Sequence, residues 1–379
     1  MKRFIILLLS LILLTGCTRQ QETLLLPPSE PTATPILPVT NEANTNEEIA
    51  FDFISVSVPA VNESVQLEDG SALFSYLSQH IQIMHPDADL TDRITLDFLN
   101  RVDKVMPEAQ NALASAQEQY NPDLPWYPYF YNILYNPTRI DNDVLSLAGT
   151  QSSFIGGMHS NIFAVSANYD MMTGDVLTLG SIMHENAGKE EFINIILDKL
   201  EKQKEDLYLF DDYADAVYSR FKVDTHLYED FFFTTTGLNF YFSPYEIAPY
   251  TSGVITVEIP YEELPGLIYD GYFPAEREQI QGNLHWKRMD EMDMTQFDNM
   301  VEVMLSETDS PLVVYPEGAV EDIKITIAGD GRNIQSYTVF AAPKMNDSNA
   351  IVIYATDEVI QNISVHYYSG NAYEQLNIA

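Results

Sequence analysis

The pattern of hydrophobic and polar positions predicts a mixture of strands and helices in the first three quarters of the chain. Alternating or continuous apolar runs of strand length predict strands at 50–58, 126–140, 143–154, 162–167, 175–179, 231–234, 238–242 and 254–259. Apolar residues at helical spacing predict helices at 71–84, 107–120, 189–207 and 211–221. Because these elements do not repeat as βαβ units, we expect an α+β fold with a mixed or antiparallel sheet and packed helices.

The last part of the chain has a different pattern. Between 271 and 307 it is polar and contains Met289, Met292, Met294 and Met304. From residue 312 onward, short apolar segments alternate with turn residues. The segments are 312–315, 323–328, 336–342, 350–355 and 363–368. Five strands at this spacing predict a small all-β, sandwich-like domain. We therefore place an α+β domain at 50–273 and a second domain at 274–379.

The N-terminus has the pattern of a lipoprotein signal. Lys2 and Arg3 precede the apolar run 4–14, which is shorter than the roughly 20 residues of a membrane-spanning helix. Leu14-Thr15-Gly16-Cys17 resembles a bacterial lipobox. We expect a signal peptide at 1–16, a lipidated Cys17 and a proline-rich tether at 17–49, which would hold the protein at the outer face of the bacterial cytoplasmic membrane. The alternative is a secretory signal with an incidental cysteine.

Charge limits the class of partner. The chain has 19 Lys and Arg against 56 Asp and Glu, a net charge of −37. Such a field disfavours binding of nucleic acid and anionic lipid and favours cationic partners. The alternative is that the negative charge only keeps the protein soluble. Cys17 is the single cysteine, which excludes an intramolecular disulfide and a cysteine-based zinc site.

Two motifs carry a family resemblance. The first places a glycine pair, a histidine and a strand before a turn, and its residues are Gly156, Gly157, His159, Asn161, Asn168, Tyr169, Asp170, Thr173, Gly174, Leu177 and Leu179. The second runs from Phe240 to Gly253 and reads FYFSPYEIAPYTSG. Together they resemble the extracellular domain of RsiV-type anti-sigma factors, a domain also carried by some surface polysaccharide deacetylases. The resemblance covers about residues 50–270.

The resemblance implies a binding function. Its relatives bind host-type lysozyme, a strongly cationic enzyme, and an acidic domain suits that ligand. The chain departs from the anti-sigma pattern because we find neither the cytoplasmic segment nor the spanning helix. Ser160 also stands where the family usually has glycine. We expect a non-catalytic surface lipoprotein that binds a cationic protein such as lysozyme, or a cell-wall component.

The loop at 244–253 is the candidate binding surface. Tyr245, Ile247, Pro249 and Tyr250 would present large, stiff side chains on a scaffolded loop. The alternative is that the prolines only fix the path of this loop across the domain end.

Catalytic motifs are absent from the sequence. The seven histidines have no i, i+4 pair, and neither a nucleophile elbow nor a phosphate-binding loop occurs. We therefore predict no cofactor and no metal site. His159 could act with Asp170 or Asn168 in a metal-assisted envelope hydrolase, but a lone histidine beside two glycines is more often a hydrogen-bonded structural residue. A glycan-binding accessory role for the last domain is a further alternative.

Overall fold

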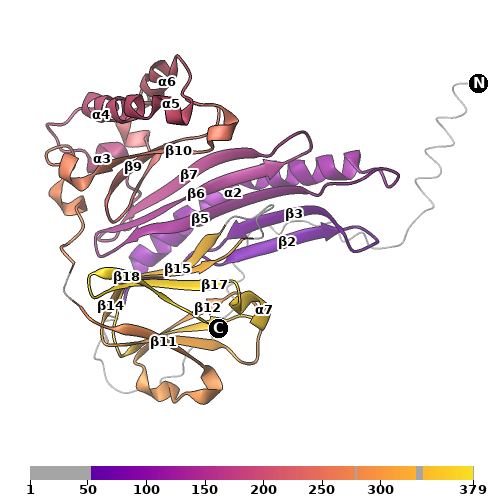
Figure 1. Ribbon diagram of the computed structural model, residues 1–379, viewed down its shortest axis with the longest axis vertical. Helices are drawn as coiled ribbons and strands as arrows, with labels where there is room; N and C mark the ends of the chain where they lie inside the picture. The colour runs from indigo at the N-terminus through magenta and orange to yellow at the C-terminus, as the bar shows by residue number, and fades with distance from the viewer. Residues whose placement is uncertain (1–52, 278–279, 330–335, 379) are drawn as a thin grey trace, which may run out of the picture. The chain divides into compact units, whose positions relative to one another are not determined.

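The first part of the structure is a five-stranded sheet with one long helix packed on it. The computed structural model describes residues 53–277, 280–329 and 336–378. The sheet has the order β2-β3-β5-β6-β7 and is antiparallel except between β3 and β5 (Figure 1). Its strands are β2 Ala60–Gln66, β3 Ala72–Gln79, β5 Tyr129–Ile140, β6 Val144–Phe154 and β7 Asn161–Asp170.

Helix α2, Ala88–Gln119, covers one face of this sheet. It begins at Asp87, whose carboxylate accepts a hydrogen bond from the Leu90 amide at 3.1 Å, and this satisfies one of the free N–H groups of the first turn. Its apolar stripe is buried in the same core cluster as the inward residues of β5 and β6. Phe98, for example, meets Tyr135 edge-on at 5.1 Å between ring centroids. The helix is therefore held by burial of one face.

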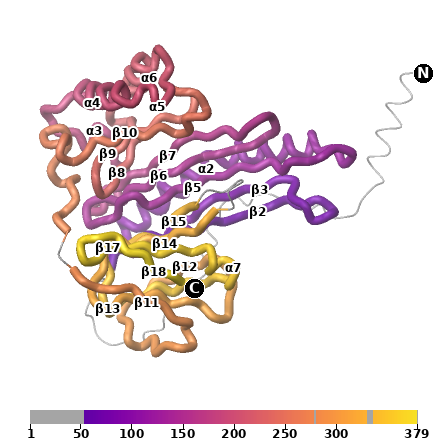
Figure 2. Tube along the Cα trace, in the orientation of Figure 1, coloured from indigo at the N-terminus to yellow at the C-terminus, as the bar shows by residue number. Residues whose placement is uncertain are grey.

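A smaller layer follows in the chain, in which helices pack on a three-stranded antiparallel sheet. The sheet order is β10-β9-β8, and α4, α5 and α6 group together beside it (Figure 2). The elements are α3 Leu179–Ile182, α4 Lys189–Lys202, α5 Lys204–Leu207, α6 Tyr213–Arg220, β8 Phe231–Phe233, β9 Gly237–Phe242 and β10 Ile255–Pro260. The core is rich in aromatic rings, with Phe240 in contact with Phe192 and Phe221.

The remaining strands form two further sheets around a shared core. Their orders are β18-β17-β14-β15-β1-β4 and β11-β13-β16-β12. The elements are β1 Ser55–Ser57, β4 Gln82–Met84, β11 Asn283–Arg288, β12 Asn299–Met304, β13 Leu312–Glu317, β14 Val320–Ile327, β15 Tyr337–Met345, β16 Asn349–Tyr354, α7 Asp357–Ile360, β17 Ile363–Ser369 and β18 Ala372–Leu376. Ile325 and Phe340 from the first sheet share a cluster with Val303 and Ile353 from the second. Strand β1 comes from the start of the described chain and pairs with β15, with Val56 opposite Ala341.

The fold class is α+β with mostly antiparallel sheets, as predicted, but some elements differ. The helix expected at 71–84 is wrong, because this segment forms β3 and β4. Successive side chains of β3 are buried, so both of its faces are covered, and that burial produces apolar positions that also fit a helix.

Two other boundaries differ from the prediction. The strand expected at 175–179 is reduced to a single bridge between Tyr169 and Val176, and α3 begins at Leu179. The helix expected from Pro107 begins at Ala88, which places Pro107 in its interior. Proline is well suited to a first turn but does not require one.

Other predictions concern the N-terminal segment and the domain boundary. The signal peptide at 1–16, Cys17 and the tether at 17–49 lie outside the described residues. The described residues form one compact unit, and the division at residue 273 stays a prediction. Within the described part of the chain, no helix combines the length and apolar character needed to cross a membrane.

Candidate functional site

The connection between β6 and β7 is shaped by the predicted glycine pair. Gly156 has φ +90° and Gly157 has φ +104°, in the region that favours glycine. A Cβ on Gly156 would also lie 2.5 Å from the Tyr129 hydroxyl oxygen. Both features fix a tight reversal, and Met158, at the turn, is 100% exposed.

The loop at 244–253, which follows β9, is fixed by hydrogen bonds and by residues buried in the core. The Tyr245 amide donates to the Ala248 carbonyl at 3.0 Å, while Ile247 and Ala248 are buried in the aromatic core. The Glu246 carboxylate accepts from the Ser243 amide and from Arg220. These contacts hold Tyr245 at φ +71°, a conformation unusual for a residue other than glycine.

Arg220 fixes this loop through both charge and ring contacts. Its guanidinium lies 3.1 Å from Asp230 and forms an ion pair with Glu246. It also lies 5.4 Å from the centroids of the Tyr241 and Phe242 rings. Burial opposes the charged form of Arg220, but the neighbouring negative charges raise its pKa overall. Arg220 therefore remains charged and positions the loop.

The structure brings the two motifs together at one place. The His159 ring stacks on Tyr250 with 4.1 Å between centroids and 23° between planes. Its Nε2 lies 3.3 Å from the Tyr245 hydroxyl oxygen. The Ser160 hydroxyl lies 3.2 Å from the Tyr250 hydroxyl, so the departure from glycine adds a polar contact here. We call His159, Tyr245 and Tyr250 the aromatic cluster.

The aromatic cluster is accessible to a partner. Tyr245 is 59% exposed and His159 is exposed, while Tyr250 is half-buried beneath them. Ile155 and Phe163, on the same end of the β6–β7 hairpin, are exposed as well. Large apolar side chains gathered at one exposed end are typical of an interaction site.

Two of the predicted loop residues take other positions. Ile247 is fully buried in the core of the smaller layer and cannot form part of the surface. Pro249 is half-buried and immediately precedes the turn Tyr250–Ser252. The sequence could not distinguish them from the two tyrosines, because isoleucine, proline and tyrosine each occur both on surfaces and in cores.

Most of the other residues of the first motif lie toward the opposite end of β7 and join this sheet to neighbouring elements. Asn161 is the exposed first residue of β7, and Asn168 is buried near its end. The Ser146 hydroxyl donates to Asn168 Oδ1 at 2.6 Å, and Asn168 Nδ2 donates to the Phe231 carbonyl at 2.7 Å. A third bond runs from the Phe233 amide to the Ser146 hydroxyl. Asn168 thus joins the five-stranded sheet to β8.

The turn after β7 is fixed by Tyr169, Asp170 and Gly174. The Tyr169 hydroxyl donates to Asp97 on α2 at 2.9 Å, and burial raises the pKa of Tyr169 well above its ordinary value. Asp170 Oδ1 accepts from the amides of Met172 and Thr173. Gly174 has φ +74°, and a Cβ there would lie 3.1 Å from the carbonyl oxygen of Leu90. These residues place α2 against the sheet.

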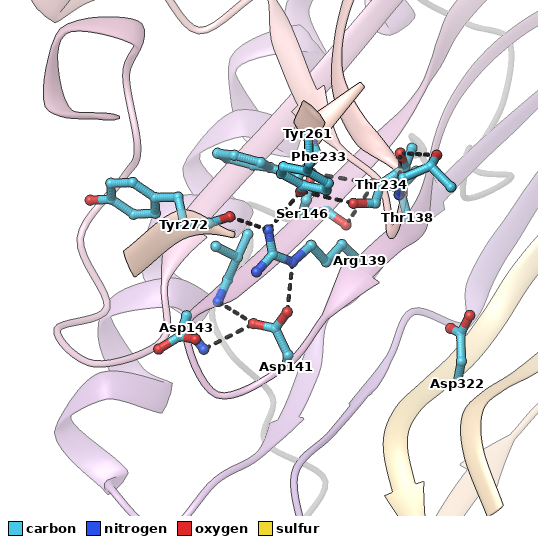
Figure 3. Close-up of polar contacts among 12 residues, drawn as sticks. Thr138, Arg139, Asp141, Asp143, Ser146, Phe233, Thr234, Tyr261, Tyr272 and Asp322 are labelled. Carbon is cyan, nitrogen blue, oxygen red and sulfur yellow. Dashed lines mark hydrogen bonds and ion pairs between the residues drawn. The ribbon is translucent and has the colours of Figure 1, made fainter. Parts of the chain in front are cut away.

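A second junction, which the sequence did not reveal, is centred on Arg139 at the end of β5 (Figure 3). Its guanidinium donates to Asp141 at 2.6 Å, to the Tyr261 hydroxyl at 2.7 Å and to the Tyr272 carbonyl at 2.6 Å. It also lies 5.6 Å from the Phe233 ring centroid. The available signal was a charged residue ending an aromatic strand, with a carboxylate two positions later.

The structure does not bring His159 together with Asp170 or Asn168, the partners considered from the sequence. Asp170 ends the strand that Asn161 begins, about 30 Å away at roughly 3.3 Å per residue, and Asn168 is almost as distant. The described ranges contain no group of three or more His, Cys, Asp or Glu side chains placed to hold a metal. The His159 ring instead lies 3.3 Å from the Tyr245 hydroxyl oxygen through Nε2 and 3.0 Å from the Ser160 carbonyl oxygen through Nδ1.

Comparison with known proteins identifies one region of the chain. Residues 181–262 match the family described as a protein of unknown function, DUF3298. The chain carries a DUF3298 domain. This DUF3298 domain contains α4 to α6, β8 to β10 and the loop with Tyr245 and Tyr250, whereas His159 precedes it in the sequence.

Two solved structures resemble the chain. One is a member of the DUF3298 family from Bacteroides fragilis, with 17% identity over 57% of this chain and 94% of that chain, and a TM-score of 0.42. The other is a DUF3298 family protein from Pseudomonas aeruginosa, with 16% identity over 58% of this chain and 97% of that one, and a TM-score of 0.40. No curated protein matches the chain.

Proposed function

We propose that this chain is a non-catalytic bacterial surface lipoprotein whose aromatic cluster binds a cationic, lysozyme-like protein. The observation that carries the proposal is the meeting of two sequence motifs about 90 residues apart, where His159 stacks on Tyr250 at 4.1 Å. A scaffold that holds tyrosine and histidine rings at an exposed end is suited to binding. Tyrosine gives a large contact area at little conformational entropy cost.

Charge supports a cationic partner. The DUF3298 domain has 16 Asp and Glu against 6 Lys and Arg between residues 181 and 262. Arg220 is engaged with Asp230 and Glu246. An excess of negative charge next to exposed rings speeds the encounter with a positive protein, in a salt-dependent way.

The proposal also includes the domain division and the lipid anchor that the sequence predicts. It places an RsiV-like region at residues 50–273 and a sandwich-like β domain at residues 274–379, whose sheet β1 and β4 complete. Lipidation of Cys17 holds the protein on the outer face of the cytoplasmic membrane. The support is the resemblance of the two motifs and of the lipobox, and the partner is the one that the resemblance implies.

Binding of hen-type lysozyme to the full chain in detergent micelles tests the proposal. We expect binding at 50 mM NaCl that weakens at 150 mM, because the Debye length shortens from about 14 Å to about 8 Å. Tyr245→Ala and Tyr250→Ala should each weaken binding about tenfold or more, since central aromatic residues dominate interfaces. Tyr373→Ala on β18 is the matched control, because Tyr373 is 55% exposed and Tyr245 is 59% exposed.

Three outcomes would count against this function. Absence of binding at both salt concentrations removes the lysozyme-like partner. An equal loss with Tyr373→Ala removes the aromatic cluster as the site. Release of fragments from cell-wall material, lost in His159→Ala, would replace binding by hydrolysis. Binding of soluble wall fragments that is insensitive to salt would favour a cell-wall component, because aromatic rings also pack against sugar rings.

A further inference from the structure

His159 uses one ring nitrogen as a donor and the other as an acceptor. Its Nδ1 lies 3.0 Å from the Ser160 carbonyl oxygen, which can only accept a hydrogen bond. The proton of the neutral ring is therefore on Nδ1, and Nε2 is left as an acceptor. The Tyr245 hydroxyl, 3.3 Å from Nε2, is then the donor in that contact.

This tautomer determines what Tyr245 presents to a partner. Because its hydroxyl proton is directed at His159, the lone pairs of the phenol oxygen are free to accept a hydrogen bond from elsewhere. Tyr245 is 59% exposed, so a partner can reach this oxygen. Lysine and arginine side chains carry donors and no acceptor, and the neutral cluster is therefore complementary to them.

Protonation of His159 reverses this arrangement. An imidazolium ring carries a proton on both nitrogens, so Nε2 becomes a donor to the Tyr245 oxygen. The Tyr245 hydroxyl proton must then turn away from the ring. The charged ring can stay in place, because a cation is attracted to the face of Tyr250, on which His159 stacks at 4.1 Å. The cluster thus presents an acceptor in one state, and a donor beside a positive charge in the other.

We propose that His159 is a pH switch for the aromatic cluster: a lysine or arginine side chain of the partner binds the Tyr245 oxygen while His159 is neutral, and mildly acidic pH releases it. Histidine is the side chain whose charge ordinarily changes between about pH 5 and pH 8. The switch rests on the proposed function, because it acts on the same site and the same cationic partner. It adds the chemical group that is recognised and the condition under which recognition ends.

The surrounding charges do not replace His159 as the switch. Between residues 144 and 169, which include its own hairpin, the sequence contains no Asp, Glu, Lys or Arg. In the loop at 244–253 the charged residue is Glu246, and both Glu246 and the nearby Asp230 are paired with Arg220. Helix α5 contacts the same loop through a hydrogen bond from Ser252 to its last residue, and its charged residues are Lys204, Glu205 and Asp206.

The competing explanation is that His159 only packs against the tyrosines, so that its protonation has no effect on binding. Both explanations predict the stack on Tyr250. Only the switch requires a fixed neutral tautomer with the proton on Nδ1. Only the switch also predicts that affinity for a cationic protein follows the charge of His159.

The first test needs no partner and uses ¹⁵N NMR spectra of the full chain in detergent micelles, labelled at histidine. The variant His159→Gln assigns the His159 resonances. We expect neutral His159 to carry its proton on Nδ1. In Tyr245→Phe the Nε2 resonance should shift, because its hydrogen-bond donor is removed, and Nδ1 should stay protonated. A neutral ring protonated on Nε2, or an Nε2 resonance insensitive to Tyr245→Phe, would overturn the proposal.

The second test measures binding of hen-type lysozyme at about pH 7.5 and about pH 5.5, at constant ionic strength. We expect the unaltered chain to lose about tenfold in affinity at the lower pH, because a hydrogen bond to a charged group is lost. The affinity of His159→Gln should differ by less than about twofold between the two pH values, because no charge is gained in the cluster.

His80→Gln is the matched control. His80 is also exposed, but it lies between β3 and β4 and outside the aromatic cluster. This variant should keep the full pH dependence of the unaltered chain. Groups of lysozyme that titrate in this range affect all three chains equally, so the comparison isolates the contribution of His159.

The outcomes separate this proposal from the proposed function. Binding at neutral pH that is insensitive to acid would overturn the switch alone. An equal pH dependence in His159→Gln, or its loss in His80→Gln, would contradict His159 as the titrating group. Absence of lysozyme binding at both pH values would remove the partner and the switch together, and the NMR spectra would still report the tautomer of His159.

Discussion

At the scale of residues, Arg139 shows how a buried charge depends on its partners. Its side chain is only 1% exposed, yet its guanidinium contacts Asp141, Tyr261 and Tyr272. The sequence shows a charged residue in an aromatic strand but not the groups that surround it, because Tyr261 and Tyr272 lie more than 120 residues away. Only the folded chain supplies them.

Replacing Arg139 should strongly destabilise the protein. We expect Arg139→Met to lower the free energy of unfolding by about 3–5 kcal/mol, because it leaves buried acceptors without a donor. Arg93→Met is the control. Arg93 is largely exposed and lies 3.7 Å from Asp175, so its loss should change the free energy by about 0–1 kcal/mol. Urea denaturation of both variants measures the difference, and equal effects would contradict the role given to Arg139.

Tyr135 should make the protein sensitive to alkaline pH. Burial raises the pKa of Tyr135 to about 12. Because the folded state favours the protonated phenol, this contribution to stability is present below the ordinary pKa of about 10 and is lost as the pH rises through 12. It amounts to about 2–3 kcal/mol by linkage.

The variant Tyr135→Phe isolates this contribution. It keeps the ring that packs against Phe98 and removes the ionisable group. Between about pH 9 and about pH 11.5, the free energy of unfolding of the unaltered chain should fall more steeply than that of the variant, as measured by urea denaturation. Parallel curves would show that Tyr135 does not carry the effect.

At the scale of elements, local pattern predicted some segments and not others. The hairpin of β8 and β9, the strand β10 and the helix α4 follow the predicted segments closely. Segment 71–84 was misassigned because successive side chains of β3 are buried, and a strand buried on both faces loses its alternation. The neighbours of a strand, which the local sequence does not show, decided that pattern.

Gly149 should be indispensable for the pairing of β5 with β6. It lies opposite Tyr135, and a Cβ there would lie 1.7 Å from the carbonyl oxygen of Leu134. We expect Gly149→Ala to lower the free energy of unfolding by about 3 kcal/mol or more, the upper range for overpacking. The backbone of β5 would have to move, because no side chain can give way.

Gly70→Ala is the matched control for Gly149→Ala. Gly70 has φ +84°, but a methyl group added there would meet no atom within 4 Å, so only conformational strain applies. Its effect should be about 1–2 kcal/mol. Thermal denaturation ranks the two variants, and a larger effect at Gly70 would show that backbone conformation outweighs the close approach of the strands.

At the scale of the whole molecule, the start and the end of the described chain share a sheet. Strand β1 lies between β15 and β4, and Phe53 belongs to the core cluster shared by the two C-terminal sheets. A boundary drawn from the sequence at residue 273 therefore separates strands that pair in space. Composition changes along the chain, but strand pairing does not have to follow it.

This pairing predicts how fragments behave. A fragment of residues 274–379 should fold poorly, because β15 lacks its partner and the core lacks Phe53. The same fragment with residues 50–59 joined through a flexible linker should recover a folded state, seen as dispersed amide resonances in NMR spectra. A well-folded short fragment would show instead that the last hundred residues form an independent domain.

The α+β class, several strands and helices, the negative charge and the two motifs can be recognised from the amino-acid sequence without the folded structure. These follow from local periodicity, turn residues and composition, which are properties of neighbouring positions. Tertiary structure alone decided that His159 stacks on Tyr250, that Ile247 turns inward, that Arg139 is enclosed and that β1 joins β15. Each of these contacts joins residues far apart in the chain or depends on packing from several elements, so no local pattern encodes it.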